Sequence, residues 1–578
     1  MSQISAATTS AQPLPTIPQS CDVLVIGSGA GGLAAAVSAA ARGLHVVVAE
    51  KAELFGGTSA WSGGWLWVPH NPAVRAEGFE EPAEAPRTYL RAVLGNRYDE
   101  AMIGAYLEAG PRMAEFFSAE TEVKFLPGSK VPDFHGHLPG AATGGRSMVA
   151  APYDGRKLGP LLARMRAPIP ETTFMGLGIA SGVDLYHFLH ATRHWRSFFH
   201  VTGRVARHMA DLALHGRAMR LVNGNALIAR LLRSAADRGV ALHERLACVR
   251  LLTEAGRVTG AELDGPEGRV TITARRAVVL AAGGFPQDGL RQQSQFPHRQ
   301  TPHSSAAPRE NNGDGLRLGE QAGGQVRTDL SDAGAWAPVS LVPRPDGTLG
   351  RFPHLIDRAK PGLIAVTGAG TRFTNEAAPY HDFMRGLFAA TPPGQPVQAW
   401  LLCDSTFIHR YGLGAVKPFP VPKRAHLRSG YLKRGRTLAE LARVCGIDEA
   451  ALATTLAAYN GAAQRGEDPE FGRGTTLFQR VNGDAATQPN PCVAPLMRAP
   501  FYAVRVVPGS LGTFAGLETD AKARMLDAQH QPIPGLFAVG NDMSSIMGGA
   551  YPSGGITLGP AMTFGWIAAQ TIATETGI

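Results

Sequence analysis

The chain has 578 residues, a formal net charge of +9 and 44% hydrophobic residues. This length allows two or more domains with large cores, and the hydrophobic fraction is that of an ordinary soluble globular protein. The basic residues are scattered and form no stripe interleaved with aromatic residues, so nucleic acid is not an expected partner.

Three further features favour a cytoplasmic location. Residues 1–20 have neither a basic start nor an apolar core, so we expect a disordered tail rather than a signal peptide. No apolar run reaches about 18 residues, which disfavours a membrane-spanning helix. The cysteines stand in no zinc, haem or ferredoxin spacing, so we expect reduced thiols and no metal site. They are Cys21, Cys248, Cys403, Cys445 and Cys492.

The first motif runs from Cys21 to Ala52, CDVLVIGSGAGGLAAAVSAAARGLHVVVAEKA. It predicts a buried strand, an Ala-rich helix and a second buried strand. Glycines in GxGxxG spacing fill the first turn, where they allow a pyrophosphate to approach the helix N-terminus. Glu50 ends the second strand and is placed to accept hydrogen bonds from an adenosine ribose. The predicted dinucleotide-binding residues are Gly27, Gly29, Ala30, Gly31, Gly32, Glu50 and Lys51.

A second patch of small residues follows in KAELFGGTSAWSGGWLWVP, from Lys51 to Pro69. Here the sequence resembles the fumarate reductase/succinate dehydrogenase flavoprotein superfamily, in which this segment runs along the ribityl chain and isoalloxazine of FAD. The resemblance implies FAD as cofactor. Some members attach FAD through a histidine in this loop, but Gly57 stands at about that position, so non-covalent FAD is expected. The implied contacts are Gly57, Thr58, Ser59, Ser62, Gly63 and Gly64.

Three later segments also resemble that superfamily: the first and last match the remaining parts of its FAD domain, and the second lies in the middle of the chain. RAVVLAAGGFPQD, from Arg276 to Asp288, is a buried strand and turn that carries Ala282 and Gly283. NNGDGLRLGEQAGG, residues 311–324, resembles a further segment near the flavin. IPGLFAVGND is the closing strand and turn, and the implied cofactor contacts there are Gly540, Asn541 and Asp542.

The expected fold is therefore α/β, with a Rossmann-type FAD-binding domain assembled from separated segments and an α+β catalytic, capping domain. The FAD-binding domain is expected in three parts, separated by a helical insertion and by the catalytic domain. The predicted boundaries are 1–20 for the tail, 21–150, 223–290 and 504–578 for the FAD-binding parts, 151–222 for the insertion and 291–503 for the catalytic domain.

The catalytic segment contains GLIAVTGAGTRF, which predicts a hairpin over 362–373, followed by NEAAPYHDF. Fumarate reductases and aspartate oxidases carry an arginine five residues after the asparagine of this motif. Here that position is Tyr380, which cannot clamp a carboxylate as an arginine does. A tyrosine there resembles the 3-ketosteroid dehydrogenases, in which it abstracts a proton from the steroid ring.

The stretch GGAYPSGGITLGPAM, residues 548–562, also resembles the ketosteroid dehydrogenases. The resemblance implies that the Tyr551 hydroxyl and the Gly555 N–H polarise the 3-keto oxygen and stabilise the developing enolate. Tyr380 then takes a proton while hydride passes from the adjacent carbon to flavin N5. Gly555, Thr557 and Leu558 are also implied as FAD contacts.

Two positions depart from the 1,2-dehydrogenating members. Phe134, in VPDFHGHLPG, replaces a tyrosine that assists the base, with His135 or His137 as a substitute. Ser553 replaces a glycine, and a serine at this position resembles the sequence of relatives that desaturate the 4,5-bond. Phe134 and Ser553 are the expected substrate-pocket residues, and the 1,2-bond, the 4,5-bond and a non-steroid ketone all stay open.

Residues 175–220 predict two amphipathic helices rich in histidine and arginine. They form either a helical cap or a basic face that touches the inner side of the membrane and admits an apolar ketone. Because no iron–sulfur or haem motif is present, electrons are expected to leave to a quinone, a redox protein or oxygen.

Two other functions stay open. A fumarate reductase-like enzyme acting on a small carboxylic acid would need cations at the flavin, and the candidates are Arg372, Arg385, His381 and His354. A flavin-binding redox protein without turnover would bind FAD that no ketone reduces.

Overall fold

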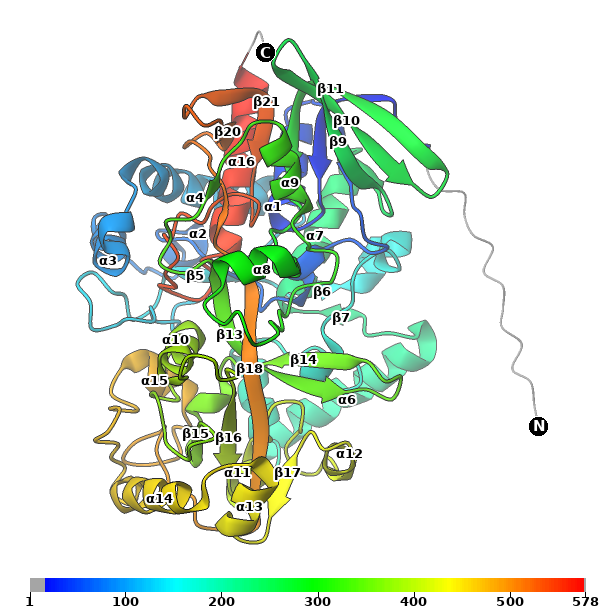
Figure 1. The fold of residues 1–578 in the computed structure, drawn as a ribbon. Helices are drawn as coiled ribbons and strands as arrows, with labels where there is room; N and C mark the ends of the chain where they lie inside the picture. The colour runs from blue at the N-terminus through cyan, green and yellow to red at the C-terminus, as the bar shows by residue number, and fades with distance from the viewer. Residues whose placement is uncertain (1–15, 576–578) are drawn as a thin grey trace.

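The computed structural model describes residues 16–575, so most of the predicted tail lies outside the described residues. An eight-stranded sheet occupies the upper half of Figure 1. Its parallel part has the order β21 (Pro532–Ala538), β11 (Gly268–Leu280), β1 (Ser20–Ile26), β2 (Val46–Ala49) and β8 (Ala241–His243). Segments from both ends and the middle of the chain therefore form one sheet.

The composition of these strands explains their central position. Val23–Ile26 of β1 and all four residues of β2 are buried, as expected for parallel strands covered on both faces. Three strands extend the sheet in antiparallel fashion: β9 (Ala247–Glu254), β10 (Arg257–Gly265) and β20 (Arg524–Leu526).

The Ala-rich helix α1 (Ala30–Ala40) packs against α16 (Leu558–Thr574) and α7 (Asn223–Asp237). A Cβ atom at Gly565 would lie 2.5 Å from the carbonyl oxygen of Gly31, so only glycine allows α1 and α16 to approach this closely. This contact joins the last helix of the chain to the first.

An antiparallel sheet forms the lower half of Figure 1, and the long strand β18 connects it to the upper half. Its strands are β13 (Gly334–Pro343), β14 (Leu349–Pro353), β15 (Leu363–Val366), β16 (Ala399–Cys403), β17 (Lys433–Gly435) and β18 (Phe501–Thr513). The helices of this half are α10 (Tyr380–Ala390), α11 (Ser405–Arg410), α12 (Arg424–Arg428), α13 (Leu438–Cys445), α14 (Glu449–Ala463) and α15 (Leu477–Asn482). A second apolar core lies here, separate from the main one.

The remaining elements connect and cover the two halves. The strands are β3 (Trp65–Trp67), β4 (Phe125–Pro127), β5 (Ser147–Ala150), β6 (Tyr153–Asp154), β7 (Arg220–Leu221), β12 (Val326–Arg327) and β19 (Gly516–Leu517). The α-helices are α2 (Pro72–Arg75), α3 (Ala85–Leu94), α4 (Glu100–Glu120), α5 (Val183–Leu189), α6 (Trp195–His215), α8 (Gly289–Gln295) and α9 (Asp314–Gln321). Short 3-10 helices are η1 (Gly57–Trp61), η2 (Gly95–Arg97), η3 (Gly155–Leu162), η4 (Pro170–Thr172) and η5 (Asp357–Ala359).

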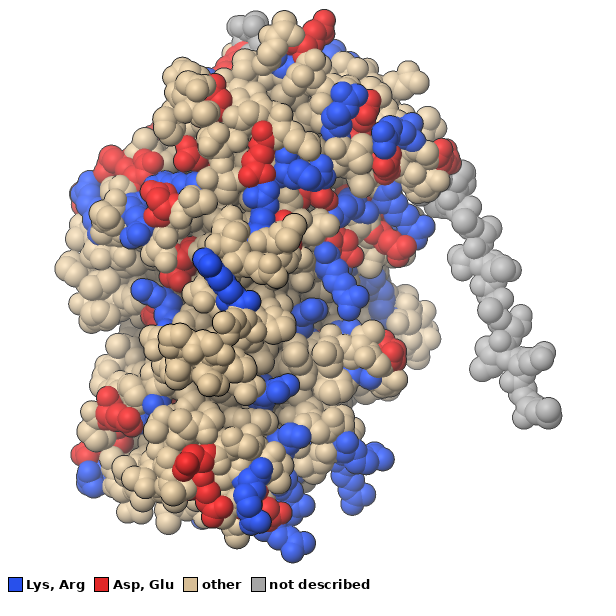
Figure 2. Space-filling view, in the orientation of Figure 1, with Lys and Arg blue, Asp and Glu red and all other residues tan. Residues whose placement is uncertain are grey.

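The predicted α/β fold, with a sheet built from separated segments and a second α+β part, is confirmed. The predicted hairpin over 362–373 is wrong, because β15 pairs with β16 and residues 371–373 form no strand. The two helices expected in 175–220 are α5 and α6, whereas the domain boundaries stay a prediction. Basic and acidic side chains are interspersed over the face shown in Figure 2.

Candidate functional site

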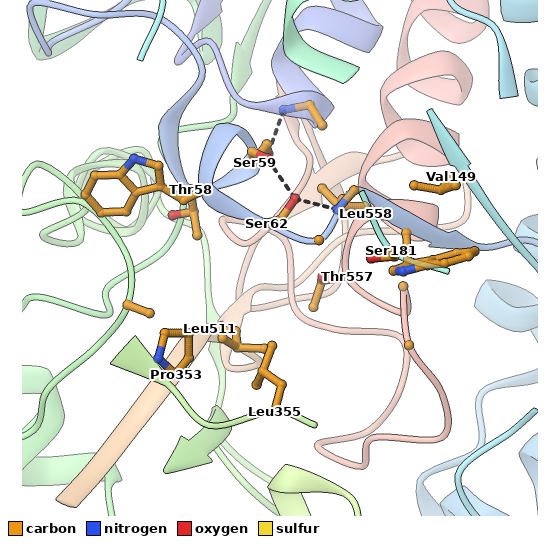
Figure 3. A pocket seen from close by; sticks show the side chains of 18 of the residues that line it. Thr58, Ser59, Ser62, Val149, Ser181, Pro353, Leu355, Leu511, Thr557 and Leu558 are labelled. Atoms are coloured by element: carbon orange, nitrogen blue, oxygen red, sulfur yellow. Dashed lines mark hydrogen bonds between the residues drawn. The ribbon is translucent and has the colours of Figure 1, made fainter. Parts of the chain in front are cut away.

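A cavity of about 1740 Å³ is lined by residues of both halves. Pockets for one drug-sized ligand usually measure roughly 300–1,000 Å³, so this cavity has room for a dinucleotide and a second molecule. Figure 3 shows Pro353, Leu355 and Leu511 together on one side, while Ser59, Ser62 and Thr557 lie across from them. The cavity is thus polar and glycine-rich on one side and apolar on the other.

The turn between β1 and α1 fits a pyrophosphate. Gly27 has φ +109°, and a Cβ atom there would lie 2.3 Å from the Ala281 carbonyl oxygen. A Cβ atom at Gly32 would lie 2.2 Å from the Gly27 carbonyl oxygen, so both glycines are required for packing. Gly29 and Ala30 line the cavity at the N-terminus of α1, which is the end that attracts phosphate.

Glu50 is held in place at the end of β2. Its Oε2 accepts hydrogen bonds from Ser28 N at 3.0 Å and Ser28 Oγ at 2.6 Å, and its Oε1 accepts one from Ala52 N at 2.9 Å. Ser28 therefore supports the predicted ribose acceptor, a role that the sequence motif alone did not reveal. Lys51 also lines the cavity, and its ammonium pairs with Asp314.

The second patch of small residues forms η1 and the loop after it. Ser59 Oγ accepts a hydrogen bond from Ala30 N at 3.0 Å, which ties this loop to the start of α1. Ser62 Oγ donates to Ser59 O at 2.7 Å and accepts from Gly64 N at 3.1 Å. These hydrogen bonds fix the conformation of the loop, and its residues line the cavity beside the glycine turn.

Asp542 is fully buried and does not line the cavity. Its carboxylate accepts hydrogen bonds from Ala282 N at 2.5 Å and Gly284 N at 2.8 Å. Burial raises the pKa of Asp542 to about 6, and these N–H groups act against that rise. Asp542 therefore links the turn after β21 to the turn after β11 without facing the cavity.

Asn311 lines the cavity and donates to Thr58 Oγ1 at 3.0 Å and to Gly283 O at 3.3 Å. It was missing from the predicted contacts, although the NNGDG turn that contains it was a signal for this part of the site.

The two predicted catalytic phenols meet in the cavity. Tyr380 is the first residue of α10, and its ring centroid lies 4.9 Å from that of Tyr551, with the rings nearly perpendicular at 81°. Phe134 stacks on Tyr551 at 5.7 Å and meets the edge of Tyr380 at 5.6 Å. Phe478 of α15 lies 4.5 Å from Phe134, measured between ring centroids, and completes an aromatic wall.

Both phenols are strongly desolvated. Burial raises the pKa of Tyr551 to about 12. Burial, reinforced by the neighbouring Tyr551, raises the pKa of Tyr380 well above its ordinary value, while the charge of Arg358 acts in the opposite direction. Arg358 donates to the carbonyl oxygens of Glu376 at 2.6 Å and Ala378 at 3.2 Å, so it also fixes the backbone that leads into Tyr380.

Gly555 lies against the backbone of β3 with φ +103°, and a Cβ atom there would lie 2.5 Å from Trp67 N. Its carbonyl oxygen accepts a hydrogen bond from Trp67 N at 3.1 Å, which fixes the loop before α16. Ser553 is fully buried and does not line the cavity, where its neighbour Gly554 faces Phe134.

Most of the predicted site residues are therefore neighbours in one cavity, and Asp542 and Ser553 lie outside its lining. The residues that line it are Gly27, Gly29, Ala30, Gly31, Gly32, Glu50, Lys51, Gly57, Thr58, Ser59, Ser62, Gly63, Gly64, Phe134, Ala282, Gly283, Tyr380, Gly540, Asn541, Tyr551, Gly555, Thr557 and Leu558.

The four cations considered for a small carboxylic acid pair with carboxylates, although the ring of His381 also packs 5.8 Å from that of Tyr551. Arg372 is buried between Glu376 and Asp468, at 2.7 Å from an oxygen of each. His354 lies 2.6 Å from the carboxylate of Asp357. His381 and Arg385 both face Asp332, and none of the four is among the residues that line the cavity.

The sequence and the fold match known proteins over almost their whole length. The model of the family described as FAD binding domain matches residues 22–558. The chain is 39% identical to the 4-oxocyclohex-2-ene-1-carboxylate 5-dehydrogenase of Sinomonas cyclohexanicum, covering 96% of this chain and 94% of the relative. It is 35% identical to a 3-oxosteroid 1-dehydrogenase of Mycobacterium tuberculosis, covering 97% and 99%.

A solved structure is similar as well. The 3-ketosteroid delta1-dehydrogenase of Sterolibacterium denitrificans, in complex with 1,4-androstadiene-3,17-dione, superimposes with a TM-score of 0.90 at 36% identity. The match covers 97% of this chain and 100% of that chain.

Proposed function

The chain belongs to the FAD binding domain family, and we propose on this premise that it is an FAD-dependent dehydrogenase of cyclic ketones. The reaction introduces a carbon–carbon double bond next to the ketone. The observation that carries the proposal is the meeting of Tyr380 and Tyr551 in the cavity that also contains the glycine-rich turns.

Three residues of the chain would act directly on the substrate. The Tyr551 hydroxyl and the Gly555 N–H hold the carbonyl oxygen and stabilise the negative charge that develops on it. Tyr380 takes the proton from the carbon next to the carbonyl group. When bound, FAD would accept the hydride that leaves the neighbouring carbon. The turns after β1, β2, β11 and β21, with η1, would hold FAD non-covalently.

Two substrate classes fit this chemistry. The names of the relatives support either a 3-ketosteroid or a cyclohexanone that carries a carboxylate. For a steroid we propose the 1,2-bond, because Ser553, the residue that favoured the 4,5-bond, lies outside the cavity lining. A small carboxylic acid is a poorer fit, since each of the four cations considered for it faces a carboxylate and none lines the cavity.

Anaerobic reduction of the bound flavin tests the proposal. We expect a ketosteroid, or a 4-oxocyclohexanecarboxylate or its methyl ester, to bleach the yellow holoenzyme, and succinate to leave it unchanged. If succinate alone bleaches the flavin, the enzyme is fumarate reductase-like and the proposal is wrong. If no ketone bleaches it, the proposal is also wrong, and the protein binds flavin without this activity. A quinone and a redox protein are the proposed acceptors, and reoxidation assays distinguish them from oxygen.

We also propose that the protein is cytoplasmic and that α6 touches the inner face of the membrane. Trp195, Phe199 and Leu214 of this helix are 69%, 66% and 76% exposed, and Arg196 and Arg207 are exposed beside them. Such a basic, aromatic face suits an interface of anionic lipids. Within residues 16–575, no helix is both long and apolar enough to cross a bilayer.

Sedimentation with lipid vesicles tests this contact. We expect the protein to sediment with anionic vesicles, and a variant carrying Trp195→Ser and Phe199→Ser to remain in the supernatant. A matched pair on another exposed surface, Leu290→Ser and Leu349→Ser, should sediment like the wild type. Equal sedimentation of all three proteins would contradict the contact.

A further inference from the structure

Lys360 lies in the wall of the cavity, in the part formed by the antiparallel half of the molecule. It caps the C-terminus of η5, and its carbonyl oxygen accepts a hydrogen bond from Arg473 Nη2 at 2.8 Å. Arg473 Nη2 also donates to Arg358 O at 2.8 Å. The backbone of Lys360 is therefore fixed, and its side chain extends from a rigid base.

The charge of Lys360 lacks a partner. Its Nζ donates to Gly483 O at 2.7 Å, but an ammonium has three N–H donors. Two carboxylates act on it electrostatically, and both are bound elsewhere: Asp484 by Arg193 at 3.1 Å and Asp357 by His354 at 2.6 Å. Among the described residues, no ion pair includes Lys360. Burial accordingly lowers its pKa to about 8.

Lys360 is half-buried and lines the cavity, so its remaining N–H donors are open to a ligand there. A neutral ligand that covered this ammonium would cost free energy, because it would remove water without supplying an opposite charge. If the side chain at this position only filled space, methionine or leucine would do so at a lower cost in free energy. The position of the charge inside the ligand cavity, rather than in the core, points to an anionic ligand that supplies the missing partner.

One short helix links Lys360 and the phenols along the cavity lining. Helix α15 lines the wall between them: Phe478 near its start contacts Phe134 beside the phenols, and Gly483 directly after its end binds Lys360. Gly483 follows Phe478 by five positions, so these two backbone positions lie about 7.5 Å apart along the helix. A six-membered ring with a ketone and a carboxylate on opposite carbons spans about 6 Å, given bonds of about 1.5 Å, so it would extend along a stretch of lining of this length.

Part of the lining is apolar. Leu355 and Ile356 precede η5 and line the same cavity, and Asp484, which follows Gly483, lines it as a carboxylate paired with Arg193. Arg480 of α15 also lines it, but this side chain is exposed and donates to Gly474 O at 3.2 Å. The cavity thus contains two phenol hydroxyls and the ammonium of Lys360, with apolar side chains in its lining.

We propose that the substrate carries a carboxylate on the side of its ring away from the ketone, and that Lys360 binds this carboxylate. The inference rests on the proposed function, and it selects a ring ketone acid over an uncharged steroid. Lys360 acts in binding and orientation, and it takes no part in proton transfer.

The test measures the activity of the holoenzyme on two substrates that differ in charge and by one methyl group, 4-oxocyclohexanecarboxylate and its methyl ester. We expect wild-type kcat/KM to favour the acid by at least about 30-fold, since losing one partner of a buried charge pair costs about 2 kcal/mol or more. The variant Lys360→Met should remove this preference through KM, and Lys360→Arg should retain most of it. Lys130→Met is the matched control, because Lys130 is an exposed lysine elsewhere on the cavity wall.

A binding measurement separates recognition from turnover. Cyclohexanecarboxylate has no ketone, so calorimetric titration into the holoenzyme reports binding of the anion alone, and we expect Lys360→Met to weaken it by the same factor. A wild-type enzyme that turns over acid and ester equally, or a Lys360→Met variant that keeps the preference for the acid, would overturn the proposal. If the acid, the ester and a ketosteroid all leave the wild-type flavin oxidised, the proposed function itself fails.

Discussion

At the scale of single residues, the contact between Tyr380 and Tyr551 gives a direct prediction. The variant Tyr380→Phe removes the proposed base, and we expect the rate of flavin reduction by a ketone to fall by about 10²–10⁴-fold. FAD content should not change, because the turns that would hold the cofactor lie on other elements. Anaerobic stopped-flow absorbance measures both quantities, and near-normal flavin reduction in this variant would exclude Tyr380 as the base.

The same phenol predicts a dependence on pH. Burial raises the pKa of Tyr380 well above its ordinary value, so its proton-accepting phenolate is scarce at neutral pH. The rate of flavin reduction should therefore rise with pH, by about tenfold per unit, as long as the pH stays below that pKa. In Tyr380→Phe the slope should disappear, and a wild-type rate that is flat between pH 7 and 9 would contradict the prediction.

Replacing Arg372 should lower the stability of the protein, because its side chain pairs with buried carboxylates and does not line the cavity. Its side chain is 1% exposed and is shared by Glu376 and Asp468, so Arg372→Met leaves two buried carboxylates with one partner fewer. We expect the free energy of unfolding to fall by about 3–5 kcal/mol. The control is Arg385→Met, whose side chain is 58% exposed and which should change stability by less than about 1 kcal/mol. Urea unfolding of both variants measures this difference.

At the scale of elements, the β1–α1 turn predicts a loss of cofactor. Gly27→Ala introduces a Cβ atom 2.3 Å from the backbone oxygen of Ala281 at φ +109°, so the turn or the neighbouring strand must move. We expect protein purified without bound flavin. The control Gly461→Ala changes a glycine of helix α14 whose Cβ meets no atom within 4 Å, and it should retain FAD. The flavin-to-protein absorbance ratio distinguishes the two outcomes.

The segment after β15 shows why local pattern misled at this scale. The glycine turn after the first strand indicated a second strand, but Arg372 turns inward to Glu376 and Asp468. Two buried ion pairs with charge-assisted hydrogen bonds outweigh the pairing of three residues in a short strand. Their partner Asp468 lies almost a hundred residues along the chain, so no local sequence signal reports the contact.

At the scale of the whole molecule, the proposed FAD site joins segments from both ends and the middle of the chain. Cofactor binding should therefore stabilise the whole upper half. At a free FAD concentration of 100 times Kd, we expect about 2.7 kcal/mol of added stability, visible as a higher Tm in a thermal scan of FAD-depleted protein. Gly27→Ala should show no such shift, and an equal shift in both proteins would argue against this site.

The sequence by itself determined the α/β fold and the FAD-binding family, because the glycine spacing, the buried β-branched runs and the motifs of the flavoprotein superfamily are local features of the sequence. It also predicted the two phenols as catalytic residues, and their role stays a prediction. Only the tertiary structure decided which residues share the cavity. It placed Asp542 and Ser553 outside the lining and Arg372 in an ion-pair network. It also placed Lys360 in the cavity wall, where it forms no ion pair with residues 16–575. The reason is physical: the free energy of a charge depends on its burial and its partners, and these come from segments far apart in the chain.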